Sequence, residues 1–379
     1  MSPILLTMIL GLFLGLLAGA IMQRSEFCMA AAFRDFFLFR STTLLAALLI
    51  LVTVSAGLFE LVRFLTGSAQ FIAPEFGAPA LVTIFAGGVF GIGMTLAGGC
   101  VVGTLYHLGA GSRLALWGLV GLIGGSALYA EIYPFWNPWK QMTTLGPQTV
   151  TLPQWSGLPP WLFVLALMLV TGLFHWRWPK AFAPLPGWRE INGYIPPLYA
   201  ALALAGVGTL SVLLLGHPLG VTTSYAKMAA LLERLLVPGH LAATPYFQTQ
   251  TTIAFPFMAG VLPASPGPAI DGIAVLQFPL ILGIILGSAL SAWHLGEWRW
   301  SRGAPWRQTL SVLMGGVLMG LASRLASGCN IWHLWGGLPI FSVQSCFFLL
   351  GLFPGAWLGG RLLVRWVLPE KHQGDGVNE

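Results

Sequence analysis

Long apolar stretches, each about the length of one membrane crossing, follow one another along most of the chain. A helix needs about 20 mostly apolar residues to cross the hydrocarbon of a bilayer. Nine stretches approach this length: Pro3–Ile21, Thr42–Phe64, Ala78–Leu96, Leu114–Tyr133, Leu158–Phe174, Ile195–Leu215, Ile273–His294, Leu310–Leu325 and Ile340–Leu363. The pattern predicts an all-α integral membrane protein with about nine transmembrane helices, in which residues 1–379 form a single transmembrane domain.

Composition excludes a fold solvated by water. Only 8% of the 379 residues are charged, whereas soluble domains carry about 25%. The chain has 48 glycines and 16 tryptophans, and membrane proteins are enriched in Gly within helices and in Trp at the bilayer interface. The net charge of +6 comes from scattered basic residues rather than from a patch, so it does not indicate nucleic-acid binding. The only extended partner that composition predicts is membrane lipid.

The basic residues instead predict an orientation. If the nine stretches cross in turn, only Arg63, Lys140, Lys227, Arg234 and Arg324 fall on one side, and the remaining Lys and Arg of the total of 18 fall on the other. Cytoplasmic loops carry the excess of Lys and Arg. The N-terminus is therefore expected outside the cytoplasm and the C-terminus inside it.

Four connecting segments are too short to cross and too apolar for simple loops: Glu26–Phe37, Gly98–Ala110, Leu219–Leu232 and Ser327–Gly337. Irregular backbone at membrane depth is tolerated only inside protein or beside a water-filled cavity. The segments are expected to be short re-entrant or broken helices that dip toward the centre. Interfacial helices are the alternative.

An internal repeat relates the two halves of the chain. Aligning Cys100 with Cys329 also superimposes Gly87 on Gly316 and Gly91 on Gly320, with the common pattern G-x-x-x-G-x-x-x-x-L-A-x-G-C. The first repeat covers about residues 1–135 and the second about 195–365, and a single linking helix at about 158–178 would invert the second. Inverted repeats with interrupted helices are typical of transporters, with the substrate bound near the midplane. The glycines spaced by four are expected to allow close helix packing.

Two of the breaks end in a glycine followed by a cysteine. Glycine permits sharp turns and a close approach of the backbone to a ligand, and a helix that starts at the cysteine would direct unpaired N–H groups at an anion. Cys28 lies in the first short segment, and hydroxyls at Thr222 and Thr223 stand at the corresponding place in the second half. The predicted substrate-binding residues are Cys28, Cys100, Cys329, Gly99, Gly328 and Asn330.

Thiols are soft, polarizable and weakly donating partners for another sulfur atom. Neutral thiols are expected at these sites because an anion needs donors, although a buried cysteine often simply fills space. Cys346 lies in the apolar run SVQSCFFLLG and is interpreted as packing. No C-x-x-C pair is present, which argues against a disulfide framework, a zinc site and a thioredoxin-like motif. His107 and His333 have no metal-ligand spacing, so no metal is expected.

Charged residues within the apolar stretches have simpler explanations. Glu60 and Arg63 are three apart on a helix and are expected to form a local ion pair. Arg324, three residues before Ser327, either lends positive charge to an entrance or extends to the interface. An ionisable residue at membrane depth is a functional hypothesis by default.

At three motifs the sequence resembles the YeeE/YedE family of bacterial inner-membrane proteins, whose characterised members take up thiosulfate. The motifs are RSEFCMAAAFRD around Cys28, LAGGCVVG around Cys100 and LASGCNI around Cys329. The resemblance implies an hourglass-shaped protein in which these three cysteines pass thiosulfate through S–H···S hydrogen bonds. It also implies a cytoplasmic TusA-like sulfurtransferase as partner. Some members are linked to selenium metabolism, and His107 and the stretch WHLWGG after Cys329 match no defined role.

Three functions remain open at this point. A permease for thiosulfate or a related sulfur or selenium species needs no cofactor, and the chain has no G-x-x-x-x-G-K-[ST] nucleotide motif. A thiol oxidoreductase would need two cysteines close enough for disulfide exchange. A scaffold that anchors a sulfurtransferase would use the basic segment Arg177–Arg189 for docking. The permease is favoured, and an enzyme is not expected.

Overall fold

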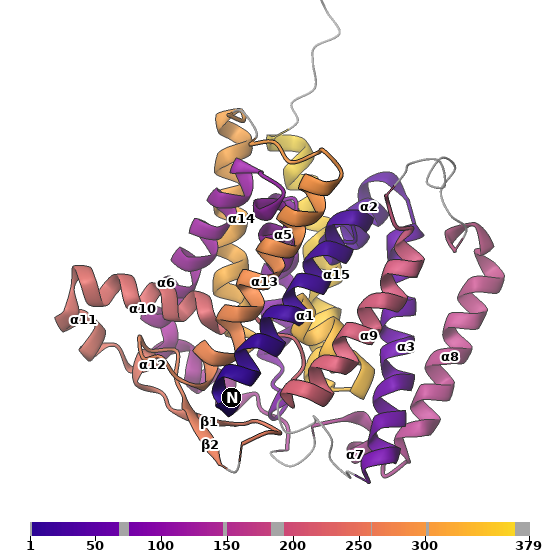
Figure 1. Ribbon diagram of the computed structural model, residues 1–379, viewed down its shortest axis with the longest axis horizontal. Helices are drawn as coiled ribbons and strands as arrows, with labels where there is room; N and C mark the ends of the chain where they lie inside the picture. Colours follow the sequence, from indigo (N-terminus) through magenta and orange to yellow (C-terminus); the bar gives the residue numbers. More distant parts are fainter. Residues whose placement is uncertain are drawn as a thin grey trace, which may run out of the picture.

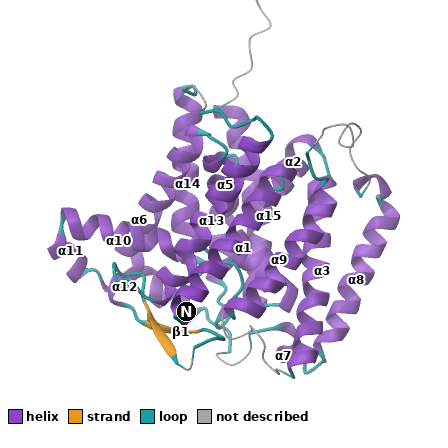
Figure 2. Ribbon diagram, in the orientation of Figure 1, coloured by secondary structure: helices purple, strands orange, loops and turns teal. Residues whose placement is uncertain are grey.

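The computed structural model describes residues 2–67, 76–146, 150–182, 193–258, 260–300 and 303–367. Long helices that stand side by side make up most of it (Figures 1 and 2). The long helices are α1 (Pro3–Ser25), α3 (Thr43–Thr66), α4 (Val82–Leu96), α6 (Arg113–Met142), α8 (Pro160–Arg177), α9 (Pro197–Leu215), α13 (Gly272–His294), α14 (Trp306–Leu325) and α15 (Val343–Trp366).

Eight helices in the described part of the chain are long and apolar enough to cross a membrane. The prediction of an all-α integral membrane protein is therefore confirmed. One of the nine predicted crossings, α14, is not among these eight helices. It has 20 residues but includes Arg307 and Arg324. Helix α14 packs along α6, which is one of the eight.

The two ends of the bundle differ. The start of α1 lies at the end that also carries the strands β1 (Thr251–Ala254) and β2 (Val261–Ala264), here called the hairpin face. The end of α15 lies at the opposite end, here called the C-terminal face (Figure 1). The nine crossings that the sequence predicts, an odd number, would likewise place the start of α1 and the end of α15 on opposite faces.

Four short helices begin within the four predicted breaks: α2 (Met29–Phe39), α5 (Val101–Gly109), α10 (Thr223–Leu236) and the π-helical turn η3 (Ile331–Gly337). Most residues of α5 and of η3 are buried, as is the first half of α2. These buried parts lie inside the bundle, which favours the re-entrant interpretation for α2, α5 and η3. Helix α10 is buried only up to Ala230, and the residues after it are half-buried or exposed.

Helix pairing follows the sequence repeat. Helix α1 packs on α13 as α9 packs on α3, and α4 packs on α15 as α14 packs on α6. The first helices of the two halves run in opposite directions, because the N–H of Ile195, just before α9, donates to the carbonyl of Arg24 near the end of α1 at 3.0 Å. Near the start of α14, the Ser311 hydroxyl donates to the carbonyl of Leu96 at the end of α4 at 2.8 Å. These contacts are those of two inverted repeats, and the proposed repeat boundaries stay a prediction.

The repeated glycines hold equivalent helix pairs together. A Cβ on Gly87 or Gly91 would overlap the backbone of α15, and one on Gly316 or Gly320 would overlap the backbone of α6. Small residues let membrane helices approach closely. The expectation that these glycines serve packing is confirmed in both repeats.

Two details of the sequence interpretation were wrong. The fourth crossing does not end at Tyr133, because α6 continues through Pro134 and Pro138 to Met142. Proline usually ends a helix, but membrane helices tolerate it because neighbouring groups satisfy the freed backbone. The third crossing begins at Val82 and not at Ala78, because Ala80 instead pairs with Thr144 in a β-bridge.

The Pro- and Thr-rich segment 237–272 contains two kinds of element. They are the short helices α11 (Pro238–Ala243) and α12 (Pro245–Gln248) and the antiparallel pair β1–β2. The remaining short elements are α7 (Leu152–Ser156), η2 (Pro179–Ala181) and η4 (Leu338–Ile340). Most of the predicted docking segment Arg177–Arg189 lies outside the described residues.

A buried ion pair ties this segment to the bundle. Lys227 of α10 donates to Asp271 Oδ2 at 2.9 Å and to the carbonyls of Gly267 and Ala269 at 2.8 Å each, and both side chains of the ion pair are almost fully buried. The other carboxylate oxygen of Asp271 caps α13 by accepting from the N–H groups of Ile273 and Ala274. The pair therefore fixes the hairpin segment against α10 and α13.

Replacing Lys227 by methionine is expected to destabilise the protein by about 3–5 kcal/mol, because a buried carboxylate loses its partner. Adding Asp271→Asn, which keeps the capping oxygen, is expected to recover part of the loss. Thermal unfolding in detergent measures both. A double variant that is less stable than Lys227→Met alone would contradict this account.

Candidate functional site

Cys28 and Cys100 stand at the starts of two short helices and face each other. Cys28 is the N-cap of α2, and Cys100 is the N-cap of α5. Their thiols lie within hydrogen-bonding reach of each other, and the side chains are buried. The N–H of Gly103 donates to Cys100 Sγ at 3.3 Å. A helix therefore starts at Cys100, as expected, and the N–H of Gly103 in its first turn is directed at the cysteine sulfur.

Gly103 was not anticipated as part of this site. A Cβ there would lie 3.3 Å from Cys28 Sγ and 3.5 Å from Cys100 Sγ, so both sulfur atoms rest against this glycine. The Tyr106 hydroxyl also lies within reach of the Cys28 thiol. Both residues follow Cys100 by about one and two turns of α5, and only the pairing with α2 reveals their place.

Cys329 begins the equivalent break of the second repeat. It is 1% exposed, and its sulfur lies near the backbone N–H groups of Ile331 and Trp332 in the first turn of η3. π-Helical turns are rare and occur frequently at functional sites. Cys329 also lies close enough to Cys100 to interact with it electrostatically. The fold thus brings the three predicted cysteines together, and Cys346, in α15, is not part of the group.

The three other predicted residues lie beside the cysteines. Asn330 is buried, and its amide nitrogen donates to Met94 Sδ at 3.3 Å while its Oδ1 has no partner in the described structure. A Cβ on Gly328 would overlap the Trp332 side chain, whereas one on Gly99 would meet only ordinary contacts. The positive φ that the turn requires is found one residue earlier in each repeat, at Gly98 (71°) and Ser327 (61°).

Tyr225 of α10 is a third residue that sequence reasoning missed. Its side chain is fully buried, and its hydroxyl has no hydrogen-bond partner among the described residues. It lies close to both Cys329 and Cys100. A buried polar group without a partner costs about 1–3 kcal/mol, so this hydroxyl is a donor that a bound ligand would satisfy. The stretch GVTTSYAK gives no signal for it apart from its place three residues after Thr222.

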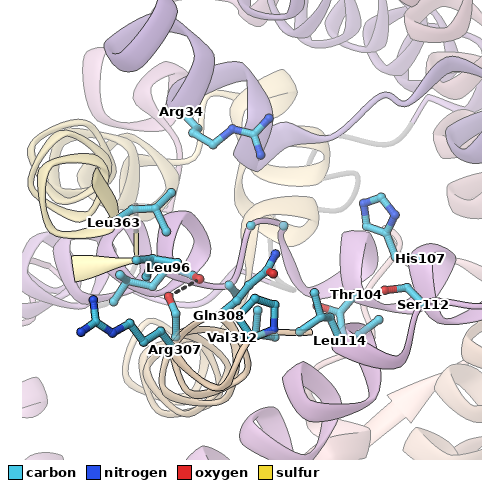
Figure 3. Close-up of a pocket in the computed structure, with 17 residues that line it drawn as sticks. Arg34, Leu96, Thr104, His107, Ser112, Leu114, Arg307, Gln308, Val312 and Leu363 are labelled. Carbon is cyan, nitrogen blue, oxygen red and sulfur yellow. Dashed lines mark hydrogen bonds between the residues drawn. The ribbon is translucent and has the colours of Figure 1, made fainter. Parts of the chain in front are cut away.

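A cavity of about 740 Å³ lies beside the turn that precedes α5 (Figure 3). Residues near the end of α15 also line it, so it is near the C-terminal face. Its lining includes the backbone of Gly98 and Gly99 and the side chains of Arg34, His107 and Arg307. Arg34 forms an ion pair with the adjacent Asp35 at 2.8 Å. Glu60 and Arg63, at 2.6 Å, form the local ion pair that the sequence predicts.

The three cysteines form one buried group, here called the thiol path in the order Cys329, Cys100 and Cys28. Each of their side chains is at most 5% exposed, and the cavity lies beside the turn that precedes Cys100. Two inverted repeats with interrupted helices are an architecture of membrane transporters.

The chain belongs to the sulphur transport family, whose sequence profile matches residues 24–358. Two relatives named thiosulfate transporter TsuA align over 92% of this chain. The one from Spirochaeta thermophila is 28% identical over 371 residues and 98% of its own length. The one from Escherichia coli is 29% identical over 367 residues and 93% of its length. A probable transporter YedE from Escherichia coli is 31% identical over 114 residues, which is 30% of this chain. The resemblance read from the cysteine motifs is confirmed, and the family is one of transporters, not enzymes.

Proposed function

We propose that this protein imports thiosulfate, or a closely related anion with an exposed sulfur atom, by passing it along the thiol path. The observation that carries the proposal is the group of three buried thiols at the starts of short helices. The Cys100 thiol contacts that of Cys28 and lies close to that of Cys329. The names of the TsuA relatives support thiosulfate as the substrate.

The chemistry of the path suits such an anion. A neutral thiol donates a weak, soft hydrogen bond to a terminal sulfur, and backbone N–H groups at helix starts favour negative charge. The substrate would move from Cys329 to Cys100 and then to Cys28, with the Tyr225 hydroxyl as a further donor midway. Because each step exchanges one set of donors for another, no covalent bond and no cofactor is needed.

Orientation and partner belong to the same proposal. The C-terminal face would be cytoplasmic in the bacterial inner membrane, since the excess of Lys and Arg falls on that side of the predicted crossings. The cavity lined by Arg34 and Arg307 would then be the exit, where a TusA-like sulfurtransferase would collect the substrate. Cysteine accessibility at the two ends of α1 and α15, probed with an impermeant reagent, tests the orientation.

A second candidate rests on one observation, the contact between the Cys28 and Cys100 thiols. An oxidoreductase would require two neighbouring thiols for disulfide exchange. All four cysteines are free in this structure, and the family is one of transporters. Transport is therefore the conclusion. A selenium species is the alternative substrate, and anchoring a sulfurtransferase is the alternative role.

The test is uptake of labelled thiosulfate by bacteria that lack their own thiosulfate transport and express this chain. Saturable uptake that unlabelled thiosulfate competes away is expected, with selenite as a weaker competitor. If the protein reaches the membrane and no thiosulfate enters, thiosulfate is not the substrate. Preferential uptake of selenite would instead support a selenium species.

A further inference from the structure

Arg324 is a buried cation without an anionic partner. It lies in the last turn of α14 and is 8% exposed. Its guanidinium donates to the Thr222 hydroxyl and, at 2.9 Å, to the Thr223 hydroxyl. No carboxylate pairs with it among the described residues, and its Nε has no partner there. An unpaired charge at membrane depth is costly and marks a functional site by default.

A second cation stands beside it. Lys140, in the last turn of α6, donates to the Ser327 hydroxyl at 2.7 Å and is close enough to Arg324 to be repelled by it. Among the described residues the two cations donate to hydroxyl groups, Lys140 to Ser327 and Arg324 to Thr222 and Thr223, and neither has an anionic partner there. An anion would remove the repulsion and satisfy the free guanidinium donor.

The backbone of Ser327 is an independent observation on this arrangement. It has a φ of 61°, at the position where the first repeat has Gly98 with a φ of 71°. A left-handed residue other than glycine costs about 1–2 kcal/mol. The second repeat thus accepts strain at a position where glycine would be free of it, and the hydroxyl gained is the one that holds Lys140.

The same comparison shows that the two ends of the thiol path differ chemically. Alignment of the repeats places Thr95 opposite Arg324, and the Thr95 hydroxyl only donates to its own helix at Gly91. Thr222 is the N-cap of α10 as Cys28 is the N-cap of α2. The first repeat therefore has a thiol where the second has hydroxyls bound to a guanidinium.

Arg324 also lies close enough to Cys329 to interact with it electrostatically. A tetrahedral sulfur oxyanion carries charge-bearing oxygens at one end and, in the proposed substrate, a sulfur atom at the other. An anion whose oxygens occupy the guanidinium would present its sulfur end to the thiol.

We propose that Arg324, supported by Thr222, Thr223 and Lys140, forms an oxyanion subsite at the hairpin-face end of the thiol path. This subsite binds the oxygens of a sulfur oxyanion and so directs its sulfur atom at Cys329. The inference rests on the proposed function for the identity of the substrate, but oxyanion binding itself does not depend on transport.

The test uses sulfate, which has the oxyanion end without the terminal sulfur. Binding of sulfate to the purified protein is followed by thermal stabilisation in detergent, at constant ionic strength set with chloride. Wild type is expected to be stabilised, and Arg324→Gln is expected to bind sulfate at least about 10-fold more weakly because charge-assisted hydrogen bonds are lost. Cys346→Ala, in α15 and outside the thiol path, is expected to bind sulfate like wild type.

Lys140→Gln provides a second variant, because Lys140 is half-buried and lies on α6, not on the helix that carries Arg324. We expect it to weaken sulfate binding about 3-fold or more, by removing one positive charge. Arg234→Gln removes an exposed charge elsewhere on α10 and is the matched control. In uptake assays Arg324→Gln is expected to raise the half-saturating thiosulfate concentration more than it lowers the maximal rate, and to make uptake insensitive to sulfate.

The outcomes separate the two proposals. Equal sulfate binding by wild type, Arg324→Gln and Lys140→Gln overturns the subsite, even if thiosulfate uptake is normal. Sulfate binding that depends on Arg324 supports the subsite even in a protein that does not take up thiosulfate, and in that case the proposed substrate fails instead.

Discussion

Thiosulfate uptake is expected to fall to the background of cells without the protein when Cys100 is replaced by alanine. Cys100 is the middle member of the thiol path, in contact with Cys28 and close to Cys329, so no route between them avoids it. A hydrogen bond to a charged group contributes about 1.5–3 kcal/mol, which corresponds to a loss of about 10–100-fold at one step. Alanine also leaves the site without a donor at the moment when the anion has shed its water.

The matched control is Cys346→Ala. Cys346 lies in α15 and is partly exposed, outside the thiol path. It is expected to leave uptake unchanged, while Cys28→Ala and Cys329→Ala resemble Cys100→Ala. Full uptake by Cys100→Ala, with the same amount of protein in the membrane, would show that transport does not use the thiol path.

Replacing Gly125 by alanine is expected to disrupt the packing between α6 and α14. The added methyl group is expected to lower the stability of the protein strongly. A Cβ at this position would overlap the carbonyl oxygen of Val317 in α14. Since backbone atoms cannot move aside, the helices must separate, and overpacking of this kind costs about 1–3 kcal/mol or more. The displaced α14 also carries Arg324 and the turn into Cys329, so uptake is expected to fall as well.

Gly124 is the matched control, one residue away on the same helix. A Cβ on Gly124 meets nothing within 4 Å, and alanine is the better helix former by about 1 kcal/mol. Gly124→Ala is therefore expected to match or exceed the wild-type melting temperature in detergent, while Gly125→Ala lowers it. Equal melting temperatures for the two variants would show that the glycine contacts do not limit packing.

The sequence predicted the membrane fold, the four breaks and the three cysteines for clear physical reasons. Apolar stretches of membrane-spanning length need no tertiary information to be recognised. A rare cysteine inside the same small-residue pattern, at Cys100 and again at Cys329, made the repeat visible in a chain with 48 glycines. The family resemblance came from these same motifs.

What the sequence did not show depends on contacts between distant segments. Nothing in the local sequence places Cys28 against Cys100, or turns Tyr225 toward Cys329. The extension of α6 past two prolines was also missed, although it carries Lys140 to Ser327. Local rules give the breaks in the helices, but only the packing of the two repeats decides which breaks meet.

The most direct test of the thiol path is the entry of labelled thiosulfate into liposomes that contain only the purified protein. Wild type and Cys346→Ala are expected to show saturable entry, and Cys28→Ala, Cys100→Ala and Cys329→Ala are expected to show none above empty liposomes. Saturable entry that persists in all three variants would contradict the account, because the anion would then cross without the thiols.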